Sequence, residues 1–179
     1  MSGIVGSAGS KSGVIGEAGG VSSAFTFVLD NDWTTNDTTI TGWNQSGDAM
    51  HKGGSFGGGL SESSGIFTFN KTGMWHVFAN LRGHHHDNDT WTGFSTKFNN
   101  AIIADSWAGR QNEKCEDAEA EPRVTNFAFN HIFSVTASTD NVRFHAFSLG
   151  TSSHILGKSG WNSIGEMGSS VTFIRLRNH

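Results

Sequence analysis

The sequence is short of cysteine, proline, tyrosine and charge, and these shortages exclude several classes of protein. A single cysteine, Cys115, rules out an internal disulfide framework. One proline among 179 residues excludes a collagen-like chain, although there are 24 glycines. Charged residues make up only 16% of the chain, whereas disordered and coiled-coil proteins need far more. No apolar run approaches the roughly 18 residues of a membrane-spanning helix, so we expect no membrane insertion.

The net charge of −4 lies in one acidic segment, and the chain has no basic patch. Residues 113–121 contain five acidic residues and Lys114, whereas the remainder of the chain sums to zero. This segment ends at Pro122, so we interpret it as a solvated loop. Because no stripe of lysine and arginine is present, we expect no nucleic-acid partner.

The first twenty residues contain an imperfect repeat with glycine at every third position. It reads GIVGSAG over residues 3–9 and GVIGEAG over residues 13–19. Glycine is costly in helices and strands but lets a backbone approach its neighbour closely. We therefore predict that residues 1–20 form an arm that anchors the folded domain, residues 21–179, to another subunit or partner; an arm packed on its own domain is the alternative. The predicted anchors are two apolar pairs: Ile4, Val5, Val14 and Ile15.

The rest of the chain carries the period-two alternation of β-strands and no helical pattern. In the clearest strand, four alternating residues are predicted to face the core: Trp75, Val77, Ala79 and Leu81. The glycine-rich run 46–65 is predicted to be a long surface loop with a short strand inside. The predicted strands cover residues 24–29, 38–43, the two halves of 65–82, 90–98, 101–107, 124–136, 141–149 and 170–177. Strands at such short spacing predict an all-β sandwich.

Three segments resemble the complement globular-head domain of the tumour-necrosis-factor-like superfamily. The phrase GIFTFNKTGMWHVFANLR has that family's Gly-x-Phe followed by a glycine–aromatic pair, although Trp75 stands where a tyrosine is usual. These positions are Gly65, Phe67, Gly73 and Trp75. NFAFNHIFSVTASTDNVRFHAF resembles the family's strand–turn–strand element, and VTFIRLR resembles its closing strand. The resemblance implies a jelly-roll sandwich of ten strands that assembles as a homotrimer, here without the proline-rich collagen stalk.

The arm resembles the opening of virion structural proteins predicted in marine tailed phages, through the phrase GIVGSAGSKSGVIG of residues 3–16. The pattern of a secretory signal is missing, because Lys11 follows the first apolar residues. A single cysteine suits a protein that folds in a reducing cytoplasm. The resemblance implies a virion component, assembled in the host cytoplasm, whose arm binds other capsid or tail proteins.

The segment HHHDND at residues 84–89 is the best candidate for metal ligation, with His84, His86, Asp87 and Asp89 as its ligands. Histidines and carboxylates together can hold zinc or another divalent cation. A polar loop at a strand end is the competing interpretation, and no cofactor is expected. The phrase Asp30–Asn31–Asp32 is a weaker calcium candidate, because it lacks the glycine and the final glutamate of an EF-hand loop.

No pattern in the sequence predicts catalysis. Residues 53–57 match G-x-S-x-G around Ser55, but that motif requires a strand before the serine and a helix after it. We interpret the match as chance in an all-β chain. His131 and His145 lie on predicted strands, and we expect them to be hydrogen-bonded interior or interface residues.

Four tryptophans near predicted loops are candidates for a surface that binds host glycans: Trp33, Trp43, Trp91 and Trp161. Packing at the core edge or at a subunit interface is the competing interpretation. Our leading hypothesis is a non-enzymatic virion structural protein, a trimeric jelly roll that serves as a decoration protein or a short fibre. A free carbohydrate-binding jelly-roll module is the second hypothesis. A metal-dependent β-sandwich enzyme, with residues 84–89 as its catalytic centre, is the third.

Overall fold

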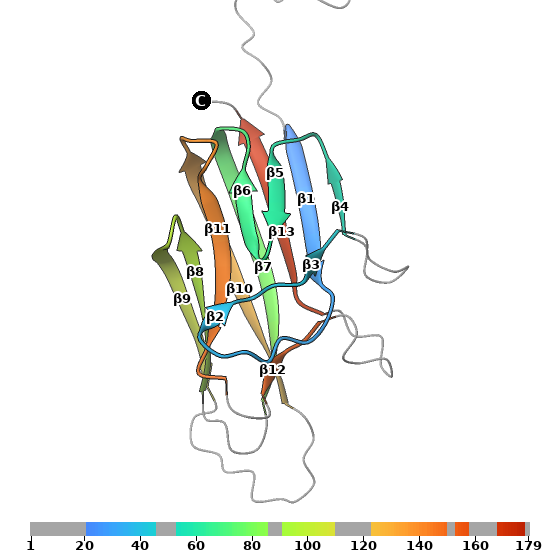
Figure 1. The fold of residues 1–179 in the computed structure, drawn as a ribbon, viewed down its shortest axis with the longest axis vertical. Coiled ribbons are helices and arrows are strands. Elements are labelled where there is room, and N and C mark those ends of the chain that lie inside the picture. Colours follow the sequence, from blue (N-terminus) through green and yellow to red (C-terminus); the bar gives the residue numbers. More distant parts are fainter. Residues whose placement is uncertain are drawn as a thin grey trace, which may run out of the picture.

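A computed structural model describes residues 21–45, 53–85, 91–109, 123–149, 153–157 and 168–177 of the chain. Within these residues the fold is all-β, with thirteen strands and no helix, arranged as two antiparallel sheets that form a sandwich (Figure 1). None of these described residues forms a helix long and apolar enough to cross a membrane. The all-β sandwich predicted from the sequence is confirmed.

The first sheet, called sheet A here, has seven strands in the order β10-β7-β13-β1-β3, with β4 beside β1 and β12 beside β7. Its strands are β1 Ser23–Leu29, β3 Trp43–Asn44, β4 Gly54–Phe56, β7 Gly73–His85, β10 Arg123–Val135, β12 His154–Ile155 and β13 Ser170–Arg177. The two longest, β7 and β10, pair without a break from Gly73 opposite Val135 to His85 opposite Arg123. This ladder is the longest strand pairing in sheet A.

The second sheet, sheet B, has six strands in the order β5-β6-β11-β8-β9, with β2 beside β11. Its strands are β2 Thr38–Thr39, β5 Leu60–Ser63, β6 Ile66–Phe69, β8 Trp91–Phe98, β9 Ala101–Gly109 and β11 Asn141–Phe147. Asn99 and Asn100 turn β8 into β9 with φ of 47° and 69°. Positive φ at both positions is what the preferred two-residue hairpin turn requires. The strands predicted over residues 90–98 and 101–107 are confirmed, and they are the two arms of this hairpin.

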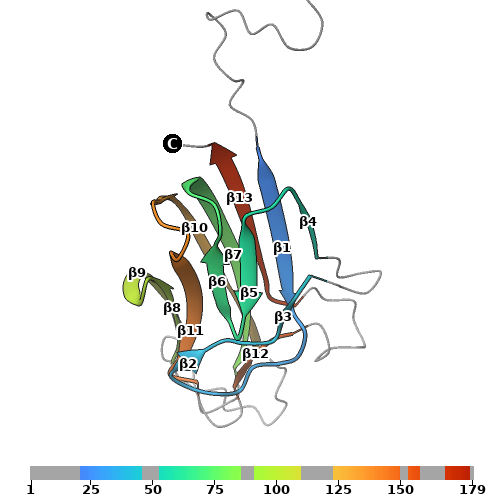
Figure 2. The same ribbon diagram turned by 45° about the horizontal axis from the view of Figure 1, so that its top comes forward.

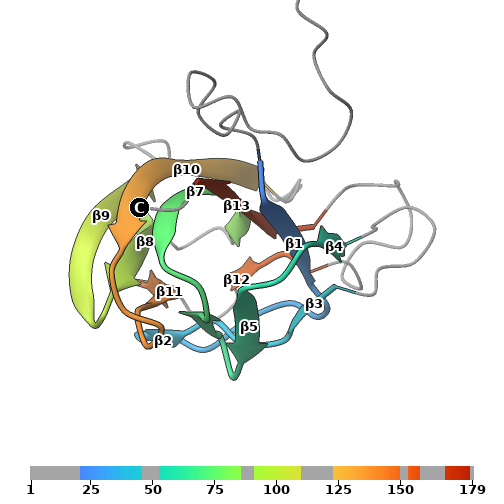
Figure 3. The ribbon, with the colours of Figure 1, turned by 90° about the horizontal axis from the view of Figure 1, so that it is seen from above.

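The core lies between the two sheets and is largely aromatic. Trp75, Val77 and Ala79 of β7 are completely buried, as their alternation predicts. Phe67 of sheet B packs against Phe27 and Phe173 of sheet A, with ring centroids 5.0 and 4.8 Å apart. An end-on view shows the strands curving around this shared interior (Figure 3).

In the described part of the run 46–65, the prediction of a long surface loop is wrong, whereas the short strand predicted inside it is present and a second strand accompanies it. Both β4 and β5 lie in this run, and β5 pairs with β6 along its whole length. Gly57 and Gly59 turn the chain between the two strands with φ of 74° and 117°, a region that glycine enters without steric cost. The glycines therefore make a turn between strands, whereas their density suggested an extended loop.

The two ends of the sandwich differ in what they carry. Strand β1 begins and β13 ends at one end, whereas β12 lies at the other (Figures 1 and 2). Because residue 21 leads directly into β1, the predicted arm joins the domain at the end opposite β12.

Candidate functional site

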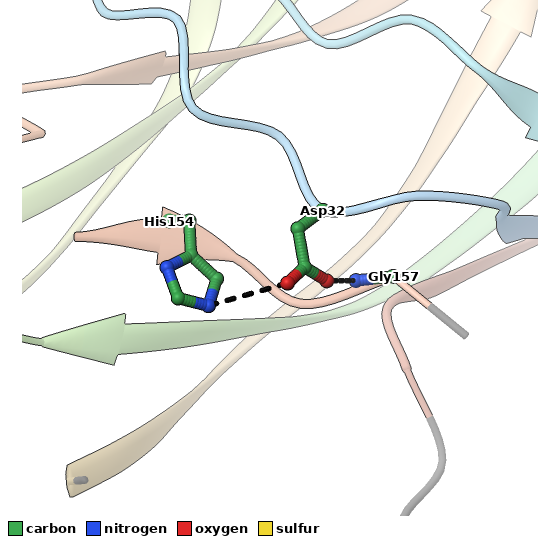
Figure 4. Close-up of polar contacts among 3 residues, drawn as sticks. All are labelled: Asp32, His154 and Gly157. Carbon is green, nitrogen blue, oxygen red and sulfur yellow. Dashed lines mark hydrogen bonds and ion pairs between the residues drawn. The ribbon is translucent and has the colours of Figure 1, made fainter. Parts of the chain in front are cut away.

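A histidine–aspartate cluster lies at the end of the sandwich that carries β12. His84 of β7 stands opposite His154 of β12 in the antiparallel register. Their rings stack, with centroids 4.4 Å apart and planes inclined by 22°. Asp32, in the loop that follows β1, places its Oδ2 3.3 Å from His154 Nε2 (Figure 4). Three segments far apart in the sequence therefore meet at this cluster.

The same loop also holds the segment around β12 by backbone contacts. Trp33 and Ile155 exchange two backbone hydrogen bonds of 2.8 Å, each residue donating once and accepting once. The Gly157 backbone N–H donates to Asp32 Oδ1 at 2.7 Å (Figure 4). A side chain at Gly157 is excluded, since a Cβ there would lie 2.5 Å from the Asn31 carbonyl oxygen. The loop and the β12 segment thus fit together along their whole contact.

In this cluster Asp32 holds the segment around β12 at two points, and we call the pair Asp32 and His154 the clamp. Asp32 and His154 are partly exposed, at 24% and 21% of their side-chain surface. An aspartate that orients a histidine occurs in catalytic triads, where the histidine acts on a nucleophile. Here the two carboxylate oxygens of Asp32 contact both sides of the β12 segment, at His154 and at Gly157. The aspartate therefore fastens a segment across the end of the sandwich.

The structure describes only one of the four predicted metal ligands, His84. His84 is half-buried and its ring is stacked on His154. His86, Asp87 and Asp89 lie outside the described residues, so ligation by residues 84–89 stays a prediction. In the described segments, no group of three or more His, Cys, Asp or Glu side chains is placed to hold a metal ion, and this includes the cluster of His84, His154 and Asp32.

The two carboxylates of the weaker calcium candidate have separate partners. Asp30 Oδ2 accepts a hydrogen bond of 3.0 Å from the Asn44 side chain on β3. Asp32 is occupied at the clamp, with His154 and Gly157. The phrase Asp30–Asn31–Asp32 therefore serves to tie neighbouring segments to the loop after β1.

The tryptophans proposed for a glycan-binding surface fall in different places. Trp43 is wrong as a surface candidate, because it is 6% exposed and its ring packs against Phe67 and Phe144. Trp33 is half-buried, packs on the edge of the core, and donates from Nε1 to the Thr35 carbonyl at 2.8 Å. Only the backbone of Trp91 is described, at the start of β8. Trp161 and the arm anchors Ile4, Val5, Val14 and Ile15 lie outside the described residues.

The remaining candidates from the sequence are accounted for by local structure. Ser55 lies on the short strand β4, and no helix follows it in the described part, so the G-x-S-x-G match forms no nucleophile elbow. His131 is exposed rather than interior, with its ring stacked between Phe129 and Phe133. His145 is half-buried and hydrogen-bonded, as predicted.

His154 is the clamp residue that the sequence analysis missed. No sequence pattern around His154 predicts its contact with Asp32, because the two segments are far apart in the chain: Asp32 and Gly157, which is close to His154, are separated by 125 residues. No protein-family model matches the chain, and no curated protein is significantly similar to it. Function has to be inferred from the residues and their geometry.

Proposed function

We propose that this chain is a non-enzymatic structural protein of a virion, which assembles as a trimeric jelly roll and docks through residues 1–20. The observation that carries the proposal is the outer face of sheet A. Among its described outward side chains, that face exposes large apolar groups and only one charged residue. A face of this kind is typical of a surface that is covered by another subunit.

The exposed apolar side chains lie on the two neighbouring strands β7 and β10. Phe78 is 44% exposed and Ile132 is 51% exposed. Half-buried Met74 and Ile174 belong to the same outer face. Arg82 is the one lysine, arginine or acidic residue among the described outward side chains of β1, β7, β10 and β13.

Composition of this kind supports a subunit interface. Protein interfaces are depleted of charged residues at their centre and enriched in aromatic residues and methionine. Soluble monomers rarely expose a large contiguous apolar patch, since such a patch promotes association. Sheet A therefore has the features that self-association through its outer face requires.

The pairing of the strands supports the jelly-roll topology. A jelly roll can be pictured as one long antiparallel hairpin rolled into two sheets, so its first strand pairs with its last and its middle strands pair with each other. Here β1 pairs with β13, β6 with β11, β7 with β10, and β8 with β9. These eight strands are nested along the chain in that order.

One further observation concerns docking through the arm, and another concerns the virion role. The arm joins the domain beside β13, at the end opposite the Asp32–His154 clamp, so docking there would leave the clamp end free. The virion assignment is supported by the resemblance of residues 3–16 to phage structural proteins. Decoration of a capsid lattice would require many copies per particle, whereas a short fibre would require few.

Native mass by light scattering tests the trimer. We expect three times the chain mass for the full-length protein, and monomers for Phe78→Asp and Ile132→Asp, because each places a charge in the apolar face. The matched control is Ile102→Asp, which changes an equally exposed isoleucine, 58% exposed, on β9 of sheet B. A stable monomer of the unmodified protein would refute the assembly and favour the free carbohydrate-binding module.

The virion role is tested separately, by labelling intact particles with antibodies against the folded domain. We expect labelled particles, and we expect a chain with Asp at Ile4, Val5, Val14 and Ile15 to remain folded and trimeric but to be left out of them. If the antibodies fail to label intact particles, the virion role is rejected, whatever the oligomeric state.

A further inference from the structure

Three basic side chains gather on the outer face of sheet B, where β11 and β8 lie side by side. In β11 the buried residues Val142 and Phe144 alternate with Arg143 and His145, which therefore face outward. Lys97 of β8 stands opposite Arg143 in the register. Sheet B thus differs from sheet A, whose outer face is almost without charge.

The hydrogen bonds of His145 determine which of its nitrogens carries the proton. Lys97 Nζ lies 3.3 Å from Nδ1, and an ammonium group can only donate, so Nδ1 accepts. The proton of the neutral ring is therefore on Nε2, which donates to Thr39 Oγ1 at 2.7 Å. The Thr39 hydroxyl keeps its own proton and remains able to donate to a further acceptor.

The cluster consequently presents donors to its surroundings. Lys97 retains two N–H groups after its bond to His145, and Arg143 uses Nη2 for one bond of 3.2 Å to Asn141 Oδ1. Arg143 Nε is buried away from solvent, so the guanidinium would meet a ligand through its Nη groups. No described carboxylate forms an ion pair with Lys97 or Arg143. Positive charge and hydrogen-bond donors are thus left without a complementary group.

We propose that Lys97, Arg143 and His145, together with the Thr39 hydroxyl, form a binding site for an oxyanion group, which a ligand lying across sheet B carries as a carboxylate or as a sulfate or phosphate ester. Charged hydrogen bonds to such a group would use the donors that the cluster leaves over. The site is independent of the proposed trimer, because it is formed by one chain.

His145 lies in a region of positive electrostatic potential. Burial lowers the pKa of His145, and the nearby positive charges of Lys97 and Arg143 lower it further. The other strands against β11 bring no titratable group to His145: β2 contributes Thr39, and β6 contributes Ile66 and Thr68. Asp105 lies on β9, which is separated from β11 by β8. The register places Asp105 opposite Ser95, and Ser95 in turn stands opposite His145.

An oxyanion at this site would favour the charged form of His145, and this effect can be measured. The experiment is an NMR titration of the histidine rings of the full-length protein in chloride, in sulfate and in glucuronate, at equal ionic strength. We expect the pKa of His145 to rise by about half to one pH unit in a binding anion. By linkage, that anion should bind about three- to tenfold more tightly below the pKa of His145 than above it. A response to sulfate indicates an ester ligand, and a response to glucuronate indicates a carboxylate.

Variants with one cation removed separate the site from general charge effects. Lys97→Gln and Arg143→Gln should each abolish most of the anion-induced rise, whereas Lys71→Gln, which removes an exposed lysine elsewhere, should retain it. Unchanged resonances outside sheet B would show that each variant is folded. The proposal is overturned if His145 responds no more than the exposed His131, or if the response survives both substitutions.

Discussion

Asp140 joins the two sheets at one end of the sandwich, and replacing it by asparagine should destabilise the protein measurably. The side chain lies in the turn between β10 of sheet A and β11 of sheet B, and it is 7% exposed. Its Oδ2 accepts hydrogen bonds from the backbone N–H groups of Thr136 and Ala137, at 2.9 and 3.0 Å. Its Oδ1 accepts from the Asn99 side chain at 2.8 Å, which links the turn to the β8–β9 hairpin.

The size of the effect follows from these three bonds. An asparagine has one carbonyl oxygen, so it can satisfy either the two backbone donors or Asn99, and its amide would face a donor at the other position. Hydrogen bonds to a charged group contribute about 1.5–3 kcal/mol each. Because the turn is partly open to water, which can replace one lost partner, we expect Asp140→Asn to lower the free energy of unfolding by about 2 kcal/mol.

The stabilisation by Asp140 should depend on pH. Burial raises the pKa of Asp140, but the hydrogen bonds from Ala137, Asn99 and Thr136 outweigh burial and lower the pKa below its ordinary value. A carboxylate with a lowered folded-state pKa stabilises the protein above the unfolded value of about 3.9, and that contribution is lost as the pH falls through the folded value. The difference between the two proteins should therefore be full at pH 7 and shrink below about pH 4.

Urea unfolding followed by tryptophan fluorescence measures this difference, since Trp43 and Trp75 are buried. Both proteins are compared at one protein concentration, because assembly would make the midpoint depend on it. Asp37→Asn is the matched control, as Asp37 is exposed and should change stability little. A loss below about 0.5 kcal/mol, or a loss equally large at pH 7 and pH 3, would refute the reasoning.

Three further substitutions test the core, a turn and the clamp. Phe67→Ala, at a completely buried ring, should cost about 3–5 kcal/mol in urea unfolding, and a cost near 1 would mean that the core is loosely packed. Gly65→Ala should lower the melting temperature sharply, because φ is +80° and its Cβ would meet a backbone carbonyl, whereas Gly54→Ala has open space and should not. Asp32→Ala removes the carboxylate that accepts from the Gly157 amide, so it should speed hydrogen exchange of that amide with little change in global stability, and unchanged exchange would contradict the clamp.

Strand identity was readable from the sequence wherever one face of a strand is buried and the other is not. Along β7 this alternation predicts the buried set of Trp75, Val77 and Ala79 correctly, because side chains on a strand alternate strictly between core and outer face. The β8–β9 hairpin was equally readable, since Asn99 and Asn100 are among the residues that tolerate positive φ. Local rules sufficed for these elements.

Features that depend on distant segments could not be read in the same way. Trp43 follows Gly42 near a predicted loop, yet its ring is buried because β3 adds to the edge of β1 and directs the side chain under sheet B. The clamp depends on β12 pairing with β7, which brings His154 to His84. The basic cluster on sheet B depends on the β8–β11 register, which no local pattern around Lys97 predicts.

The two outer faces of the sandwich have chemistries that suit different roles. Sheet A presents Phe78 and Ile132 with one charged residue among its described outward side chains, whereas sheet B presents the donors of Lys97, Arg143 and the Thr39 hydroxyl around His145. If sheet A is covered in the proposed trimer, sheet B is left as the face that each subunit turns to its surroundings. Each trimer would then carry three copies of the basic cluster. A ligand with several oxyanion groups that occupies more than one copy would bind far more tightly than a ligand with a single such group. The comparison of sulfate with a sulfated polymer, made on the trimer and on the Phe78→Asp monomer, would therefore distinguish the site itself from its display.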